Sequence, residues 1–263
     1  MSKISLLRLR IGLGISRFDI KKPTIEGLEN LPSTPCVVAT THLSDIDVQE
    51  VVVAVANIRK VGMATQSTNL THPLFEPFFK LMGMNNFFPI TNTYNKWNTK
   101  YSLIFDDFKK MHNGIEQEER TIVISAHNPT QEWKLPEKPG VGAVILAHMT
   151  NVQIIPAAVD IQCPTPVAQT TDSLTRIKNF ITMKRPKAKI YFCKPLQLSK
   201  IPNDKLIPVI NLYNRDEREK MSKEEIASAN KTLDGLKVEA EKLMLSLASK
   251  LPSSKRGKWS NFS

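Results

Sequence analysis

One short stretch of the chain has the residue types of a proton-transfer site. Residues 40–51 read TTHLSDIDVQEV, in which His42 precedes two aspartates, Asp45 and Asp47. A neutral imidazole, with a pKa near 6.5, can accept a proton at neutral pH, and a carboxylate can orient its second nitrogen. The helical wheel does not separate Asp45 from Asp47. A polar helix start is the alternative, because Ser44 and Asp47 have the spacing of a capping-box variant.

A second histidine, His127, has the same relation to a predicted strand as His42. The strands expected over residues 36–40 and 121–125 each end one or two residues before one of these histidines. In α/β sheets the loops after the carboxyl ends of strands gather into the ligand crevice. We therefore expect both histidines at one edge of the sheet, where His127 is either a new polar contact or a hydrogen-bonded loop residue.

The sequence lacks the motifs of several other enzyme classes. It contains no G-x-S-x-G elbow, no G-x-x-x-x-G-K-[ST] phosphate loop and no H-E-x-x-H metal pair. The three cysteines, Cys36, Cys163 and Cys193, show no C-x-x-C spacing and are interpreted as reduced, buried thiols in a reducing compartment. We expect neither a metal nor a cofactor.

The composition indicates a globular protein with an anionic partner. The 263 residues are 41% hydrophobic and 23% charged, and the net charge is +11. Such a charge favours nucleic acid, an anionic lipid surface or a phosphorylated substrate. Basic residues are not interleaved with aromatic ones as a nucleic-acid platform requires, so we expect no nucleic-acid partner.

Short apolar runs rich in β-branched residues alternate with longer stretches of helical periodicity. The expected strands cover residues 36–40, 61–64, 86–90, 121–125, 153–159 and 189–192. The expected helices cover residues 48–59, 73–82, 100–112 and 141–150. Since this alternation is typical of layered α/β folds, we predict one α/β domain with a mostly parallel or mixed central sheet flanked by helices.

The two ends of the chain have their own patterns. Residues 1–20 predict an amphipathic helix with an apolar line and a basic line, which is typical of a helix in a membrane interface; packing on its own domain is the alternative. Residues 197–220 are interpreted as a connector. A long final helix is expected to begin at a capping box formed by Ser222 and Glu225. The last nine residues, KRGKWSNFS, suit the same membrane surface or a disordered tail.

Residues 27–52, GLENLPSTPCVVATTHLSDIDVQEVV, resemble the opening of the glycerolipid acyltransferase superfamily, typified by the 1-acylglycerol-3-phosphate acyltransferases. Members of that superfamily run G-x-E-N-L-P, a short strand and then N-H-x-S-x-x-D. His42, Ser44 and Asp47 match this H-x4-D motif position by position, whereas Asp45 falls on a variable position. The resemblance therefore selects Asp47 as the partner of His42.

The resemblance continues in order along the chain, over roughly residues 26–196. Its later parts are the segment before the second motif, the third motif, a glycine-alanine helix with the strand of the fourth motif, and a late strand that ends in a lysine-proline turn. In this sequence they read TQSTNLTHPLFEPFFKLMGMNNFFPI, TIVISAHNPT, PGVGAVILAHMTNVQIIPAAV and KAKIYFCKPL.

Two of these motifs depart from the family pattern. Residues 85–94 contain none of the basic side chains that the second motif uses to meet the acceptor phosphate. In the third motif Asn128 stands where the family has Glu, Pro129 where it has Gly and Gln131 where it has Arg, while Thr130 matches. The phosphate clamp of the family is therefore missing. Lys134 and Lys96 are the cations that could replace it.

The resemblance implies an acyltransferase that moves a fatty acyl group from acyl-CoA or an acyl carrier protein to a hydroxyl of a lipid acceptor. His42 is the expected base and Asp47 its carboxylate. Contacts to substrate are expected from Ser44, His127, Asn128 and Thr130. From the basic charge, the amphipathic N-terminus and the cysteines we also expect a peripheral protein on the cytoplasmic face of an anionic membrane. Two alternatives stay open: a catalytically inactive lipid-binding protein on the same fold, and an unrelated α/β enzyme.

The expected domain organisation has three parts. Residues 1–20 form the amphipathic helix, and residues 21–200 form the acyltransferase-like α/β domain. Residues 201–263 supply the connector, the C-terminal helix and the basic tail, which are expected to pack on the same domain.

Overall fold

The computed structural model describes residues 12, 20–44, 46–73, 76–90, 94–95, 98–99, 105–128, 133–162, 181–182 and 185–261. The strands are β1 (Lys21–Glu26), β2 (Val37–Thr40), β3 (Val61–Gln66), β4 (Phe87–Ile90), β5 (Tyr94–Asn95), β6 (Asn98–Thr99), β7 (Thr121–Ser125), β8 (Ile154–Gln162) and β9 (Lys187–Phe192). The α-helices are α2 (Asp47–Ala56), α3 (Ser67–Leu70), α4 (Glu76–Met82), α5 (Phe105–Glu116), α6 (Gly142–Thr150), α8 (Asn203–Leu212), α9 (Arg215–Arg218) and α10 (Lys223–Ala248). Short 3-10 turns cover Leu28–Asn30, Met84–Asn86, Ser253–Lys255 and Gly257–Asn261.

A seven-stranded mixed sheet forms the centre of the protein. Its strand order is β1-β9-β8-β2-β7-β3-β4. The pairs β8–β2, β2–β7, β7–β3 and β3–β4 are parallel, whereas β9 runs antiparallel to β8 and carries β1 parallel to itself. The predicted layered α/β fold with a mostly parallel or mixed sheet is confirmed, including its long C-terminal helix. All six predicted strands overlap strands of the sheet.

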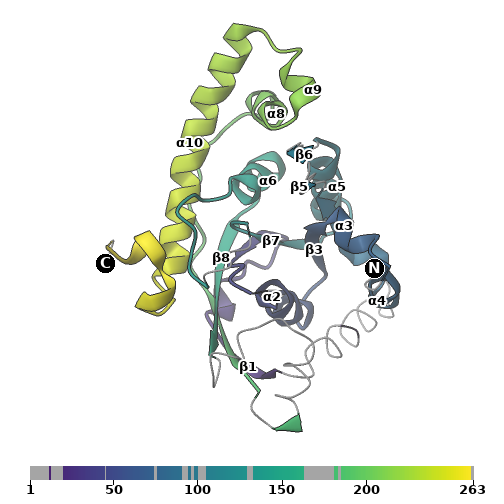
Figure 1. Ribbon diagram of the computed structural model, residues 1–263, viewed down its shortest axis with the longest axis vertical. Helices are drawn as coiled ribbons and strands as arrows, with labels where there is room; N and C mark the ends of the chain where they lie inside the picture. The colour runs from purple at the N-terminus through teal and green to yellow at the C-terminus, as the bar shows by residue number, and fades with distance from the viewer. Residues whose placement is uncertain are drawn as a thin grey trace.

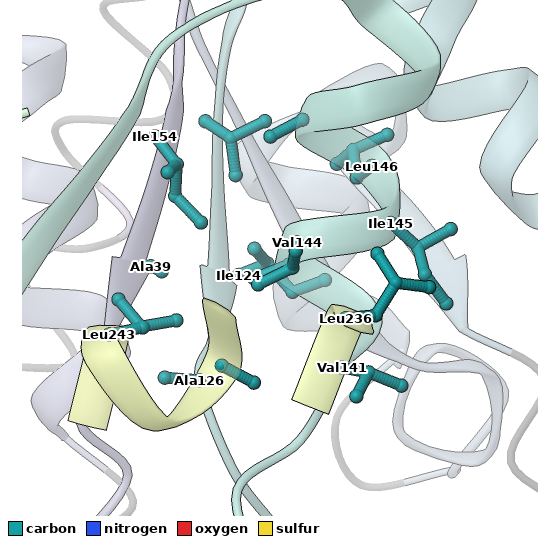
Figure 2. Packing of buried hydrophobic residues seen from close by; sticks show 14 of the residues in the cluster. Ala39, Ile124, Ala126, Val141, Val144, Ile145, Leu146, Ile154, Leu236 and Leu243 are labelled. Atoms are coloured by element: carbon teal, nitrogen blue, oxygen red, sulfur yellow. The ribbon is translucent and has the colours of Figure 1, made fainter. Parts of the chain in front are cut away.

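Helices cover both faces of the sheet, which explains the continuous apolar character of its central strands. In β2, Val37 and Ala39 point into a core formed with α5, α6, α8 and α10, while Val38 points into a second core formed with α2. Figure 1 shows α6, α8 and α10 on one side of the sheet and α2 on the other. Figure 2 shows residues of α6 and α10 gathered over β2, β7 and β8.

The first strand of the sheet escaped prediction for a physical reason. β1 reads KKPTIE, is charged, and none of its residues is buried. It lies at the edge of the sheet, where charged side chains and proline are favoured because they block pairing with another chain. Its pairing with β9 shifts register between Lys21 and Thr24, around Pro23. Strand-like composition is therefore missing where the strand is least buried.

The interpretation of residues 197–220 as a connector is wrong, because the segment contains α8 and α9. Pro208 lies inside α8, a position that normally disfavours a helix since proline lacks the N–H donor. Leu206, Val209 and Ile210 are fully buried in the core against α6 and α10. Burial of these three side chains outweighs the local preference, so tertiary packing decides the helix.

The long helix α10 begins as predicted. Ser222 accepts from the backbone N–H of Glu225 at 3.1 Å, and the Glu225 carboxylate accepts from the backbone N–H of Ser222 at 2.7 Å. This reciprocal pair confirms the capping box. The apolar stripe of α10 is buried against the domain; it comprises Ala229, Leu233, Leu236, Ala240, Leu243 and Leu247.

Replacing Ser222 by alanine should destabilise the protein by about 1 kcal/mol, because one helix N–H loses its acceptor. The control is Ser228→Ala, an exposed position within α10 where alanine favours the helix. Urea unfolding followed by circular dichroism measures both. A loss for Ser228→Ala as large as that for Ser222→Ala would contradict the capping role.

The predicted amphipathic helix over residues 1–20 lies outside the described residues, apart from Gly12 and Ile20. In the described part of the chain, no helix combines the length and the apolar character needed to cross a bilayer.

Candidate active site

The two histidines singled out by the sequence meet at one edge of the sheet. Thr40, the last residue of β2, pairs with Ser125, the last residue of β7. The chain leaves both strands in the same direction, and the backbone N–H of His42 donates to Nε2 of His127 at 3.1 Å. The expectation that both histidines share one edge is therefore confirmed.

The half-buried ring of His42 has a defined tautomer. Its Nδ1 lies 3.0 Å from the carbonyl oxygen of Ser44, and a carbonyl only accepts, so Nδ1 carries the hydrogen and donates it. In the neutral ring the lone pair is then on Nε2. A histidine arranged in this way can accept a proton at Nε2 while the backbone orients the opposite side of the ring.

Asp47 lies fully buried at the first position of α2. Its carboxylate accepts from the backbone N–H of Leu43 at 2.8 Å, from the hydroxyl of Ser44, and from the side chain of Thr41. Burial raises the pKa of Asp47 from 3.8 to about 7, against the opposing effect of these hydrogen bonds and of the charge on Lys255. These contacts tie the carboxylate to the loop that carries His42.

The alternative of a simple polar helix start does not describe this loop. The N-cap of α2 is Ile46, which makes no side-chain cap. Ser44 uses its spacing from Asp47 for a hydrogen bond between the two side chains instead of a cap to the helix backbone. The polar residues of the stretch therefore hold the loop before the helix. Asp45 lies outside the described residues.

The other expected site residues have different surroundings. Ser44 is 7% exposed and its hydroxyl donates to Asp47, while His127 is 3% exposed and uses both ring nitrogens within the protein. Asn128 is exposed, and its carbonyl oxygen accepts from Nδ1 of His127 at 2.7 Å. Thr130 lies outside the described residues. Of these four, Asn128 is the described residue with a surface open to a substrate.

Sequence reasoning missed two residues of this site. Thr41 Oγ1 accepts from the backbone N–H of Val159 at 3.0 Å and contacts Asp47, which joins the His42 loop to β8. Lys255 Nζ donates to the carboxylate of Asp160 at 2.6 Å and to the carbonyl of Ile161 at 2.7 Å. Thr41 is a polar residue directly before His42 in the sequence, and this position could have indicated its part in the site. Lys255 carried none, because only tertiary folding brings it to β8.

The segment after α10 packs on the loop that leads from β7 to α6. The backbone N–H of Leu135 donates to the carbonyl of Lys255 at 2.9 Å, and Nε1 of Trp259 donates to the carbonyl of Pro136 at 2.9 Å. Trp259 is 4% exposed. The two interpretations of this tail were a disordered segment and a segment with aromatic side chains at the membrane. Both are wrong for Trp259, because its ring is buried against the protein.

Three features bear on what the protein could bind. Among the residues that the structure describes, no group of three or more His, Cys, Asp or Glu side chains could hold a metal ion. Lys134 lies exposed on the loop between β7 and α6, and Lys96 lies outside the described residues. A hollow of about 420 Å³ between β1, β9 and the end of α10 is lined by Tyr191, Cys193 and Lys250 among others, and by none of the candidate site residues.

The fold was compared with solved structures of known proteins. The chain is similar to the crystal structure of the 1-acyl-sn-glycerophosphate acyltransferase PlsC from Thermotoga maritima, with 12% identity and a TM-score of 0.47, over 90% of this chain and 79% of that one. The sequence matches no protein-family model and no curated protein. At this degree of likeness the activity has to be argued from the residues of the chain itself.

Replacing His127 by glutamine should reduce the loss of stability in acid. Burial lowers the pKa of His127 from 6.5 to about 4, helped by the charge of His42 and opposed by the bond to Asn128. Between these values the unfolded chain binds a proton that the folded protein excludes, so stability falls as the pH falls. The contribution is about 2–3 kcal/mol between pH 7.5 and pH 4.5, and the glutamine variant lacks it.

Urea unfolding at both pH values measures this difference, with His112→Gln as a control that removes a partly exposed histidine on α5. The same pH dependence in wild type and His127→Gln would show that His127 titrates normally.

Proposed function

We propose that the protein is an acyltransferase that moves a fatty acyl group from an acyl thioester to a hydroxyl of a glycerolipid or related lipid. The observation that carries this proposal is the His42 loop: an imidazole with its lone pair on Nε2, held at the sheet edge by Ser44, Asp47 and His127. The ordered resemblance to the glycerolipid acyltransferases over roughly residues 26–196 supports it.

In the proposed mechanism His42 acts as a general base. Nε2 takes the proton of the acceptor hydroxyl as its oxygen attacks the thioester carbonyl carbon. The tetrahedral intermediate collapses with cleavage of the carbon–sulfur bond, and the imidazolium returns its proton to the leaving thiolate. The products are the acyl ester and the free thiol, and the enzyme regains its starting protonation. No acyl-enzyme is needed.

Asp47 acts on the base through the loop in this proposal. Its carboxylate holds the N–H of Leu43 and the hydroxyl of Ser44, and the carbonyl of Ser44 in turn accepts from Nδ1 of His42. The arrangement fixes the ring and places a titratable negative charge near the imidazolium that forms. This differs in detail from a direct carboxylate–imidazole pair and leaves Asp47 essential for the geometry.

The oxyanion of the intermediate needs hydrogen-bond donors beyond the His42 loop. The backbone N–H groups of Thr41, His42 and Leu43 already donate to Ala157, His127 and Asp47. Donors placed where negative charge develops lower the barrier most when they are fixed before reaction. We propose that the exposed Asn128, which follows His127 at the same edge, contacts the reacting groups.

The acceptor is proposed to be held mainly by its hydrocarbon part and by the membrane surface, because the residues of the family's phosphate clamp are replaced here. The net charge of +11 fits a peripheral protein on an anionic leaflet, which would be the cytoplasmic face. Acyl-CoA and an acyl carrier protein are both suitable donors. Binding without catalysis is the second candidate, favoured by the same altered third motif.

Incubation with anionic vesicles, an acyl thioester and a total lipid extract separates the two candidates. Formation of acylated lipid, detected by mass spectrometry, supports the enzyme. Vesicle binding with no consumption of acyl-CoA or of acyl carrier protein thioester would support the binding protein instead.

A further inference from the structure

His127 occupies a position from which it cannot serve as a second base. The ring is 3% exposed, and both of its nitrogens are used within the protein. Nε2 accepts from the backbone N–H of His42 at 3.1 Å, and an amide N–H can only donate. Nδ1 therefore carries the ring hydrogen and donates to the carbonyl of Asn128 at 2.7 Å. The two hydrogen bonds therefore require the same neutral tautomer, with the hydrogen on Nδ1.

The hydrogen bond from the N–H of His42 to His127 lies just after β2, where the backbone stops pairing with the neighbouring strand. The N–H of Thr41 still donates to the carbonyl of Ala157 on β8. One residue later the N–H of His42 has turned away from β8 to His127, and the N–H of Leu43 donates to Asp47. Three successive amides are held by three different parts of the fold. His127 supplies the middle one, at the residue that carries the proposed base.

The surroundings of His127 keep its ring in place. The N–H of Gly140 donates to the carbonyl of Ala126, so the loop before α6 closes over this turn. A side chain at position 140 would lie 2.9 Å from that carbonyl oxygen and 3.5 Å from the Cα atom of His127. The backbone of residue 140 therefore packs against the turn at Ala126 and His127, and the ring of His127 in this turn is 3% exposed.

We propose that His127 is a positioning residue: as its Nδ1–H tautomer it fixes the peptide of His42 and thereby the direction of the His42 imidazole. The functional part rests on the proposed acyl transfer, whereas the tautomer and the hydrogen bond do not. This assigns His127 to the loop, in place of the substrate contact expected from its sequence position. A misplacement of a catalytic group by about 1 Å can cost on the order of 100-fold in rate.

Three variants separate the two hydrogen bonds of His127. His127→Gln can place its side-chain oxygen near the position of Nε2 and keep the acceptor for His42. His127→Asn can keep a donor near Nδ1 but loses that acceptor, and His127→Leu loses both. We expect the glutamine variant to stay within about 5-fold of wild-type kcat. The other two should lose about 10- to 100-fold in kcat with little change in KM.

Nitrogen-15 NMR of the wild-type imidazoles tests the geometry without any assay of activity. Nε2 of His127 should resonate as an unprotonated nitrogen from pH 5.5 to pH 8 and show a coupling across the hydrogen bond to the amide nitrogen of His42. A proton on Nε2, or a missing coupling, overturns the proposal even if no variant folds. Equal kcat values for the folded glutamine and asparagine variants also overturn it. A wild-type protein with this NMR signature and no acyl transfer refutes the proposed function alone.

Discussion

Replacement of His42 by alanine should lower kcat for acyl transfer by about 10²- to 10⁴-fold, the range lost when a general base is removed. The imidazole donates from Nδ1 to Ser44 and carries its lone pair on Nε2, where it can take up the proton of the acceptor hydroxyl. Release of thiol from the acyl thioester, followed continuously, measures the effect.

The control for His42 is His112→Gln. His112 lies on α5, a helix that leads into β7 and so lies away from the carboxyl end of that strand. It should keep the wild-type rate within about 2-fold, as expected for substitutions away from the reacting groups. If His42→Ala folds and keeps the wild-type rate, His42 is not the base.

Replacement of Asp47 by alanine has the second large effect, mainly on stability. The fully buried carboxyl group accepts from the N–H of Leu43 and from the side chains of Ser44 and Thr41, and these donors lose their partner in the variant. The unsatisfied buried donors should cost about 2–4 kcal/mol at pH 5, and kcat should fall because the His42 loop is no longer held in place. Urea unfolding and single-turnover kinetics measure the two parts.

The same carboxylate predicts a pH dependence of defined sign. Burial raises the pKa of Asp47 to about 7, whereas the unfolded chain has the ordinary value of 3.8. Between these values the folded protein binds the additional proton, so the stabilising contribution is present in acid and is lost as the pH rises towards 7. It amounts to at most about 4 kcal/mol, and Asp47→Asn, which does not titrate, should remove it.

Asp45→Asn provides the matched control for both effects, because Asp45 falls on a variable position of the motif that this stretch resembles. We expect wild-type stability and a rate within a few-fold of wild type. Loss of activity in Asp45→Asn together with normal behaviour of Asp47→Asn would reverse the assignment of the two aspartates.

The parts of the fold that follow from local pattern were predictable. β2 and β7 are buried on both faces and therefore read as unbroken apolar runs, and the capping box at Ser222 is visible as a serine and a glutamate three residues apart. The first strand and α8 were not, because β1 is a charged edge strand and α8 contains Pro208. In α8 the burial of apolar side chains overrides local preference, and burial cannot be read from local composition.

The candidate site was predictable to a similar extent. The positions of His42 and His127 after neighbouring strands follow from parallel pairing, so their meeting at one edge could be foreseen. The roles of their contacts could not be foreseen. Nothing in the sequence indicates that the ring of His127 accepts from a backbone amide 85 residues away, or that Lys255 reaches Asp160 across 95 residues. Such contacts depend on the tertiary packing of loops that are far apart in the sequence.

We propose that this protein transfers an acyl group from a thioester to a lipid hydroxyl with His42 as base. The most direct test measures free thiol and acylated lipid in the same reaction, with wild type and His42→Ala, for acyl-CoA and for acyl carrier protein. We expect equal amounts of thiol and new ester, formed only when a hydroxyl acceptor is present and at least about 100-fold faster by wild type than by His42→Ala. Folded wild-type protein that forms no ester from either donor, or a His42→Ala variant that forms as much ester as wild type, would contradict it.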